Sequence, residues 1–370
     1  MLNPLIAAVR EFASEMAREG HACHVVSGAE PEEAQPLEPA RFQAGVRHVE
    51  GAEVRARHTG FRAPRHAGSS GFRYFLDGIQ FSRLILIINN APLVYHISAA
   101  AILRRDPATG ELHPWRRSPV CECVLTARDH LPGAARLAER LAPFGQALEE
   151  VDEEGKTSAN ALLLRDRARS KSQSLRRKLE VDLIAEWTAA APEGWLMVDG
   201  PLIPLPGLTL APRIVGVVKS FGAQYFTGAE QMRILMLPEC QRTTAFQVPR
   251  HSSRSATMEP GEGRRAYSWY VRIRDHRGRE PDFGLLRLET PPGIPLPEGA
   301  DEVSRWLIAE RAPLSSADPR WDNLLYPIHL CERYLKSLVP QRDQVPLQLR
   351  RALLEIAGTT DHTRAGPAPG

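Results

Sequence analysis

The sequence is poor in the features that mark several common protein classes. It has five cysteines in 370 residues, and no two of them form a CxxC pair. An odd number of cysteines without a CxxC pair argues against a zinc site and against a disulfide framework. No apolar run reaches membrane-spanning length, and no signal-type apolar core stands at the N-terminus. We therefore expect a protein of a reducing cytoplasm without membrane contact.

The chain also lacks a large excess of positive or negative charge. The net charge is only +3, which is too weak to indicate a nucleic-acid partner by itself. No GxxxxGK[ST] string occurs, so the chain cannot couple ATP to movement through a P-loop. What is present, 43% hydrophobic and 25% charged residues, is typical of a globular chain. Its length predicts one large domain with insertions, or two domains.

One acid stands in a strongly apolar setting. Residues 75–82 read FLDGIQFS and precede the most apolar run, residues 84–88. We predict a strand over residues 74–79 with the apolar run as its hairpin partner. Asp77 is then largely buried, which is costly unless it is paired or bound to a metal, while Gly78 lets another group approach the backbone. The alternative, which this stretch alone favours, is an Asp-Gly turn at a strand end.

A long helix is predicted over residues 158–191. Its middle is dense in arginine and lysine, and three of these are candidate phosphate contacts: Arg169, Lys171 and Arg177. Towards its C-terminal end the apolar residues form one arc, and Glu180 falls inside it. An acid on this face is held by a cation or snorkels to solvent. Glu180 is thus a candidate metal ligand, or it forms an internal salt bridge with Arg176.

A second apolar strand runs into Asp-Gly far downstream. Residues 195–202 read WLMVDGPL, and the proline bars a regular ladder, so Asp199 lies at the strand end. The next strand, at residues 213–220, delivers Lys219 at its C-terminal end, where α/β sheets place their chemistry. We predict that both groups converge with Asp77 and Glu180. Clustered carboxylates repel one another, and a divalent metal removes that cost.

The three strand motifs carry a family resemblance. FLDGIQFS, WLMVDGPL and IVGVVKS, in this order and spacing, resemble the NurA nuclease family over roughly residues 74–338. The resemblance implies a ribonuclease-H-like core, 5′-to-3′ DNA cleavage with Mn²⁺ or Mg²⁺, and a HerA-like hexameric ATPase as partner. The first motif departs from the family, because Ile79 and Gln80 follow Asp-Gly where a serine is common. This departure affects substrate contacts more than metal binding.

The resemblance also assigns roles. Asp77, Glu180 and Asp199 would hold the metal ions, and Lys219 would offset charge on the scissile phosphate. The family's C-terminal block is similar to YPIHL at residues 326–330, which opens a helix. A further histidine or acid is expected there, and His329 and Glu332, which share a helical face, are both candidates.

Further basic segments are candidate DNA contacts. Residues 55–73 carry five arginines and no acid, and residues 250–265 are rich in serine, glycine and arginine. In a strand over residues 267–274, alternation places one set of side chains opposite the core, and its candidate nucleic-acid contacts are Tyr270, Arg272 and Arg274. The alternatives are a solvated loop for residues 55–73 and a solvated sheet face for the strand.

These observations lead to an α/β, ribonuclease-H-like fold with a mixed central sheet and added helices. The expected organisation is an N-terminal helix and basic connection (1–70), a nuclease domain (71–340), and a C-terminal helix with a tail disordered from residue 358 (341–370). A helix is also expected over residues 133–150. The apolar stripe of the helix at residues 5–16 has three possible roles: it binds the HerA-like ATPase, it packs on its own domain, or it forms the interface of a homodimer. Alternative functions are a non-catalytic DNA clamp or adaptor of a translocase, and a related nuclease that cuts RNA.

Overall fold

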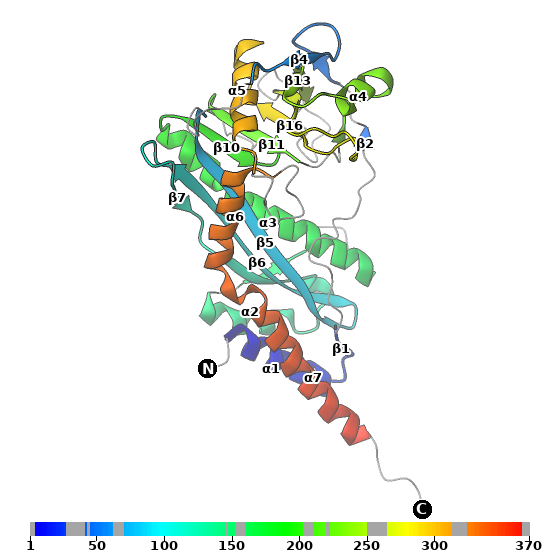
Figure 1. Ribbon diagram of the computed structural model, residues 1–370. Helices are drawn as coiled ribbons and strands as arrows, with labels where there is room; N and C mark the ends of the chain where they lie inside the picture. Colours follow the sequence, from blue (N-terminus) through cyan, green and yellow to red (C-terminus); the bar gives the residue numbers. More distant parts are fainter. Residues whose placement is uncertain are drawn as a thin grey trace, which may run out of the picture.

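The computed structural model describes residues 4–26, 41–42, 45–61, 70–145, 147–151, 160–202, 211–219, 223–249, 265–312 and 324–364. These residues form a mixed α/β fold around one large sheet (Figure 1). The α-helices are α1 (Pro4–Arg18), α2 (Ala134–Leu141), α3 (Ala161–Ala190), α4 (Gly228–Leu235), α5 (Glu298–Ala309), α6 (Tyr326–Leu338) and α7 (Gln344–Arg364).

The strands of the large sheet come from many parts of the chain and are separated by helices and loops. They are β1 (Cys23–Val25), β3 (Arg47–His48), β4 (Ala56–His58), β5 (Phe72–Ile88), β6 (Ala91–Arg105), β7 (Leu112–Arg117), β8 (Cys121–Thr126), β9 (Ala147–Glu150), β10 (Trp195–Asp199), β11 (Ile214–Val218), β13 (Gln241–Thr243), β14 (Phe246–Pro249), β15 (Arg265–Arg272) and β16 (Leu285–Thr290). A separate pair joins β2 (Arg41–Phe42) to β12 (Ala223–Gln224).

The strand β5 is the axis of this sheet. The prediction of a short strand with the apolar run as its hairpin partner is wrong, because residues 72–88 form one continuous strand. The hairpin turn comes after it, at Asn89, whose φ of 53° is left-handed, and β6 returns antiparallel along the whole length. The many aromatic and β-branched residues of this stretch favour an extended conformation. Asp77 therefore lies within a strand, and the strand-end turn is excluded.

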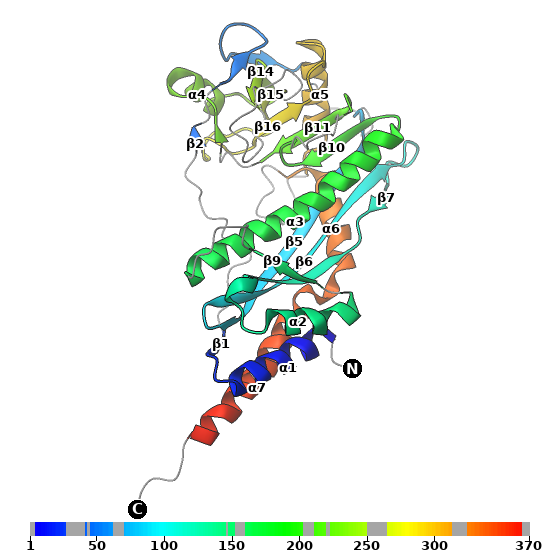
Figure 2. The ribbon, with the colours of Figure 1, turned by 180° about the vertical axis from the view of Figure 1, so that it is seen from behind.

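The sheet changes direction at β5. On one side, β6 is antiparallel to β5, and β8 is in turn antiparallel to β6. On the other side, β10 is parallel to β5, and β11 is parallel to β10. The path then continues antiparallel from β11 through β16 and β15 to β14. The helix α3 crosses one face of β5 and β6, and α6 covers the opposite face, as the two views show (Figures 1 and 2).

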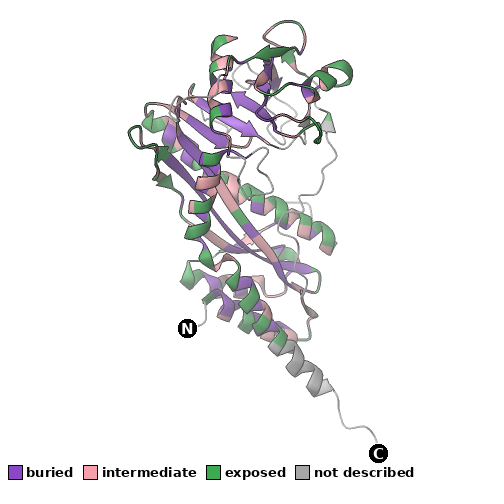
Figure 3. Cartoon of the chain, in the orientation of Figure 1, coloured by how far each residue is buried: buried purple, intermediate pink, exposed green. Residues whose placement is uncertain are grey.

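Burial follows the sheet and the undersides of its helices (Figure 3). The predicted long helix is confirmed as α3, which Asn160 caps by accepting hydrogen bonds from two backbone amides of its first turn. Within the predicted apolar arc, Leu183, Ile184 and Trp187 pack on β5, β6 and β10. None of the helices in the described ranges is long and apolar enough to cross a membrane.

The N-terminal helix is packed within the chain. All five members of its predicted stripe are buried in a core shared with α2, α7 and β5: Leu5, Ile6, Val9, Phe12 and Met16. Of the three fates considered for this stripe, packing on its own domain is confirmed, and docking of a motor through it is wrong. The predicted segments 1–70 and 341–370 therefore contact each other through α1 and α7.

Two further boundaries differ from expectation. The predicted helix over residues 133–150 is wrong in its second half, because α2 ends at Leu141 and residues 147–150 form β9 instead. There β9 pairs in parallel with β8, whose backbone groups it satisfies. At the C-terminus, helical backbone continues to Arg364, beyond the expected start of disorder at residue 358. The basic segment over residues 250–264 lies outside the described residues.

Candidate active site

Strand alternation separates two adjacent residues of β5 onto opposite faces. Asp77 pairs with Ala101, which packs beneath α6 against Cys331. Gly78 pairs with Ala100, which packs beneath α3. Cross-strand partners share a face, so Asp77 points to the α6 side and Gly78 marks the α3 side.

Asp77 is buried among other ionisable groups. Its exposed fraction is 6%, and the Gly78 amide donates a hydrogen bond of 2.8 Å to its Oδ1. Burial raises the pKa of the Asp77 carboxyl well above its usual range, and the charges of Asp199, Glu180 and Glu332 raise it further, while Lys219 acts in the opposite direction. The predicted acids and the predicted lysine are therefore close enough to act on one carboxyl group.

Asp199 and Lys219 form one ion pair at the ends of two parallel strands. The predicted placement is confirmed: β10 ends at Asp199, and Lys219 directly follows β11. The register pairs Asp199 with Val217, and Lys219 follows Val217 by two residues. The lysine backbone therefore lies just beyond Asp199 at this edge of the sheet. Lys219 Nζ lies 2.9 Å from Oδ1 and 3.0 Å from Oδ2 of Asp199. Both side chains keep about a quarter of their surface exposed.

Glu180 reaches the sheet through the space that a missing side chain leaves. It is 1% exposed although it is an acid, which confirms its predicted place inside the apolar arc of α3. A Cβ built on Gly78 would clash with Glu180 Oε1. The prediction that Gly78 admits a close neighbour is thus confirmed, and that neighbour is the Glu180 carboxylate.

Two arginines of α3 hold this carboxylate. Arg176 Nη1 contacts Glu180 Oε1, so the internal salt bridge considered for Glu180 is present. Arg177 Nη1 lies 3.2 Å from Glu180 Oε2, and its Nη2 donates to the carbonyl oxygen of Pro201, also at 3.2 Å. Burial raises the pKa of Glu180, and both arginines oppose that rise. The role of the second arginine was not apparent from sequence, although Arg177 lies three residues before Glu180 and thus on the same helix face.

The helix α6 brings its own acid. The charge of Glu332 is among those that act on Asp77, and the Glu332 carboxylate also pairs with Lys336 at 2.8 Å. His329 lies one turn earlier on α6 and is half-buried. The structure therefore places Glu332 in the electrostatic surroundings of Asp77, while the choice between Glu332 and His329 as a metal ligand stays a prediction. Between them, the Cys331 thiol donates to the carbonyl oxygens of Phe75 and Ala101 beneath Asp77, a contact that sequence reasoning missed.

The donor set fits a hard divalent cation in its chemistry. Carboxylate oxygens are the ligands that Mg²⁺ and Mn²⁺ prefer, and Asp77, Glu180 and Asp199 supply them from β5, α3 and β10. Within the described ranges, however, no group of three or more His, Cys, Asp or Glu side chains is arranged to hold a metal ion together. In this structure Glu180 and Asp199 are bound instead by arginine and lysine.

The predicted phosphate contacts of α3 divide into two kinds. Arg169 and Lys171 lie on the outer part of the helix, with side chains 43% and 32% exposed, and they pair with Asp166 at 3.7 Å and Glu149 at 3.3 Å. Arg177 belongs to the carboxylate site instead. Of the basic segment over residues 55–73, the part from residue 62 to residue 69 lies outside the described residues.

The predicted exposed face of β15 is wrong under both interpretations, as a basic DNA-binding face and as a solvated one. Tyr270, Arg272 and Arg274 are 4%, 0% and 6% exposed. Tyr270 packs in a core cluster with residues of α4 and β14, and the guanidinium of Arg272 donates to four backbone carbonyl oxygens, including those of Leu235 and Leu237. The pattern of one strand could not reveal that α4 covers its second face. These three side chains are inaccessible to nucleic acid in this structure.

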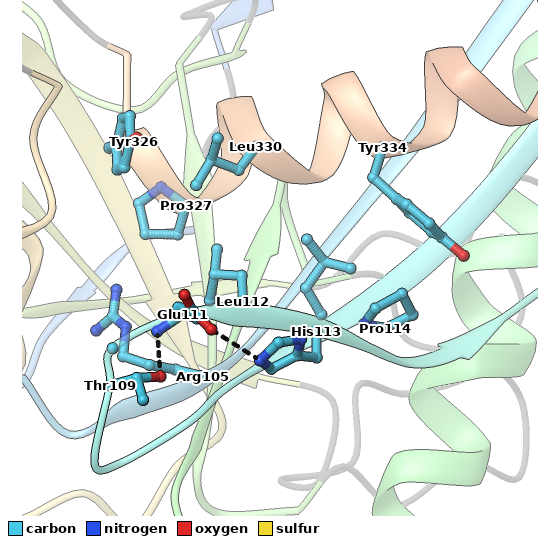
Figure 4. Close-up of a pocket in the computed structure, with 12 residues that line it drawn as sticks. Arg105, Thr109, Glu111, Leu112, His113, Pro114, Tyr326, Pro327, Leu330 and Tyr334 are labelled. Carbon is cyan, nitrogen blue, oxygen red and sulfur yellow. Dashed lines mark hydrogen bonds and ion pairs between the residues drawn. The ribbon is translucent and has the colours of Figure 1, made fainter.

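A pocket flanks α6 on the side of β6 and β7. Its volume is about 650 Å³, and one wall comes from α6 and the other from the β6–β7 hairpin (Figure 4). The labelled lining residues are Arg105, Thr109, Glu111, Leu112, His113, Pro114, Tyr326, Pro327, Leu330 and Tyr334. Arg105 is held by a bidentate ion pair with Glu310, with both distances 2.6 Å, so its charge is already neutralised. None of the predicted site residues lines this pocket.

Comparison with known proteins assigns no identity. No family model matches the chain, and no curated protein matches it. The function therefore rests on the chemistry of the site.

Proposed function

We propose that the protein is a metal-dependent DNA nuclease with a ribonuclease-H-like core. The sheet supports the fold proposal: three antiparallel strands (β5, β6, β8) are followed by a long helix and two parallel strands (β10, β11), with β5 at the centre. This order supports such a core, and the motif resemblance described above adds the nuclease class.

The observation that carries the proposal is the buried carboxyl of Asp77. An ionised carboxyl group at this place in a strand is costly, because burial and three neighbouring acids raise its pKa, and groups perturbed in this way are concentrated at functional sites. Asp77, Glu180 and Asp199 would hold Mn²⁺ or Mg²⁺, with His329 or Glu332 as a fourth contributor. A bound cation supplies activation of water and stabilisation of the leaving oxygen in phosphodiester hydrolysis.

In this proposal, Lys219 and Glu180 have separate roles toward the scissile phosphate of DNA. Lys219 is already 2.9 Å from Asp199 and a quarter exposed, so its ammonium group can turn to a phosphate oxygen that approaches the strand ends. There it offsets the charge that develops during hydrolysis. Glu180 is presented by a rigid helix over Gly78, so its carboxylate is positioned before substrate arrives.

The proposed partners are DNA, a HerA-like hexameric ATPase and a second copy of this chain. Arg169 and Lys171 lead away from the site along α3 and would follow a DNA backbone. A motor cannot bind the stripe of α1, which is buried. Leu347 and Leu354, which are 63% and 51% exposed and seven residues apart on one side of α7, offer a docking surface instead. We place this assembly in the cytoplasm.

A second function, a non-catalytic DNA clamp or adaptor, is favoured by one specific observation. Two of the predicted metal ligands are neutralised by cations of the chain itself: Glu180 by Arg176 and Arg177, and Asp199 by Lys219. Such pairs stabilise the fold without any metal. A clamp would keep the basic residues and would need no cleavage chemistry.

The test is cleavage of labelled DNA by wild type and by Asp77→Asn in Mn²⁺ and in Mg²⁺. We expect the rate to fall by at least about a hundredfold, because the variant lacks a metal ligand. The matched control is Asp182→Asn, the same chemical change at an exposed position of α3, which should cleave like wild type. Equal cleavage by Asp77→Asn and wild type would overturn the assignment, and DNA binding without cleavage by wild type would favour the clamp.

A further inference from the structure

A chain of polar side chains crosses the interface between α3 and the sheet. The His96 ring is at its centre: Nδ1 lies 2.7 Å from Ser172 Oγ on α3, and Nε2 lies 3.0 Å from Ser98 Oγ on β6. Ser172 Oγ in turn lies 3.1 Å from Ser82 Oγ on β5. His96, Ser98 and Ser172 are at most 1% exposed. Buried polar groups are costly unless they are hydrogen-bonded, and these contacts also fix the orientation of the imidazole.

Two cysteines of β8 extend this polar chain. The register pairs Cys121 with Ser98 and Cys123 with His96, so strand alternation places all four side chains on the face that α3 covers. The Cys121 sulfur has hydrogen-bonding partners in Cys123, His96 and Ser98. Cys123 is 1% exposed, whereas Cys121 is half-buried. Cys121 therefore carries the sulfur of this cluster that a small molecule from solvent can reach.

The cluster favours the thiolate form of Cys121. The hydrogen bond with the Cys123 thiol is the largest cause that lowers the pKa of Cys121, to about 5, and the other two hydrogen bonds act in the same direction against burial. The charged groups nearest to Cys123 oppose each other, because Lys171 of α3 and Glu149 of β9 form an ion pair of 3.3 Å. The hydrogen bonds thus prepare Cys121 as a nucleophile, since the thiolate is the reactive form of cysteine.

We propose that Cys121 is a modification site that reacts with hydroperoxides to form a sulfenic acid. The sulfur attacks one peroxide oxygen, so that an S–O bond forms while the O–O bond breaks. The sulfur gives up two electrons to the peroxide, and the departing hydroxide or alkoxide takes a proton from solvent. The polar groups around Cys121 first orient the thiolate and then provide hydrogen-bonding partners for the new hydroxyl group. This inference is independent of the proposed nuclease function.

The neighbouring thiol is poorly placed to convert the sulfenic acid into a disulfide. Residues two apart in a strand are separated by about 6.6 Å, and their side chains point the same way. The Cβ atoms of a disulfide are only about 3.8 Å apart. The strand β8 pairs with β6 on one side and with β9 on the other, so closing this distance would break ladder hydrogen bonds. The sulfenic acid should therefore persist until a thiol from outside the chain reacts with it.

The experiment oxidises the reduced full chain with hydrogen peroxide at pH 6 and traps sulfenic acid with dimedone. Peptide mass spectrometry with fragmentation measures the adduct at each cysteine. Cys23 is the internal comparison, because it is also half-buried but burial raises its pKa. We expect Cys121 to react at least about tenfold faster than Cys23 at this pH, because the larger thiolate fraction outweighs the lower nucleophilicity of an acidic thiol.

Two variants of Cys123 test the role of the cluster. Cys123→Ala removes the hydrogen-bond donor, so the pH at which Cys121 oxidises at half its maximal rate should rise by about one unit or more. Cys123→Ser keeps a donor and removes the second thiol, so its pH profile should stay close to that of wild type and the same adduct should form. Thermal melts verify that both variants are folded, and the comparison of Cys121 with Cys23 in wild type stands without them.

Three results would overturn the proposal. The first is a rate of adduct formation at Cys121 that is no greater than the rate at Cys23 in folded wild type. The second is a disulfide between Cys121 and Cys123 as the main product, recognised by the loss of two hydrogens without a dimedone adduct. The third is an unchanged pH profile in folded Cys123→Ala, which would show that the cluster does not activate Cys121.

Discussion

At the residue scale, Asp77 gives the stability of the protein a predictable dependence on pH. Because the pKa of Asp77 is raised in the folded state, the native protein holds this proton more tightly than the unfolded chain does. Native stability therefore falls as the pH rises from about 4, near the unfolded pKa of an aspartate, through the folded pKa. Asp77 therefore costs the native state no stability below this pH range, and its full destabilising effect is present above it.

Asp77→Asn removes this penalty because an amide does not titrate. We expect the variant to have a higher Tm than wild type at pH 7, and the difference to shrink towards zero near pH 4. Melting curves at a series of pH values measure both. A variant that is less stable than wild type at pH 7 would show instead that the carboxyl supports the fold, and Asp182→Asn should show no pH-dependent difference.

The cysteines of β8 provide a second titration. A hydrogen bond with the Cys123 thiol and a contact with His96 lower the pKa of Cys121 to about 5, whereas burial raises the pKa of Cys23. Alkylation needs the thiolate. The labelling rate of Cys121 by iodoacetamide should thus be flat from about pH 6 to about pH 8, while that of Cys23 should rise about tenfold per pH unit. Peptide mass spectrometry compares the two sites in one sample, and a parallel rise would contradict the assignment.

Much of the candidate site could be predicted at this scale because its residues belong to recognisable local sequence patterns. Asp-Gly after an apolar run locates Asp77 and Asp199, and an acid within an apolar helical arc locates Glu180. Tyr270, Arg272 and Arg274 were misplaced, because the residues that bury this face come from other parts of the chain. Alternation in one strand tells which residues share a face, and says nothing of what covers it.

At the scale of elements, the packing of α1 against α7 carries much of the stability of one end of the sheet. Phe12 is fully buried in this core, and its truncation to alanine should cost about 3–5 kcal/mol of unfolding free energy. Glu11→Ala, at the neighbouring exposed position, should cost little. Urea unfolding measures both, and equal small effects would mean that α1 is only loosely attached.

Removal of residues 1–20 tests the same packing more severely. It exposes the apolar surface of α7 and of β5 that α1 covers, so we expect an aggregating or partly unfolded protein. Circular dichroism and size-exclusion chromatography measure the result. A truncated chain that stays folded and monomeric would contradict this packing.

Element types were predicted better than element lengths. The predicted helix over residues 158–191 matches α3 closely at both ends. The prediction divided β5 in two at residues 80–83, because polar residues interrupt the apolar pattern there and local sequence cannot show that β6 pairs with this stretch. The parallel pairing of β9 with β8 is likewise a long-range interaction, which the helical pattern of residues 133–150 does not reveal.

At the scale of the whole molecule, the net charge of only +3 means that the proposed DNA binding would depend on local clusters of basic residues. Reversal of Arg169 and Lys171 to glutamate should weaken DNA binding and reduce the slope of log affinity against log salt by about 0.9 for each phosphate that the variant no longer neutralises. Fluorescence anisotropy over a salt series measures the slope. Arg277→Glu, at a position 88% exposed on another part of the surface, is the control and should leave the slope unchanged. An unchanged slope in the double variant would mean that this part of α3 is only solvated.

The length of β5 has a mechanical consequence. Seventeen residues of strand extend about 56 Å, and Asp77 sits in this unbroken backbone between the end that carries α1 and α7 and the end that meets β10. No strand boundary therefore separates Asp77 from the end of β5 that contacts α7. A shift of β5 by one residue against β6 would turn Asp77 away from α6 and present Gly78 in its place. The direction in which this acid points therefore depends on the register of one long strand pair.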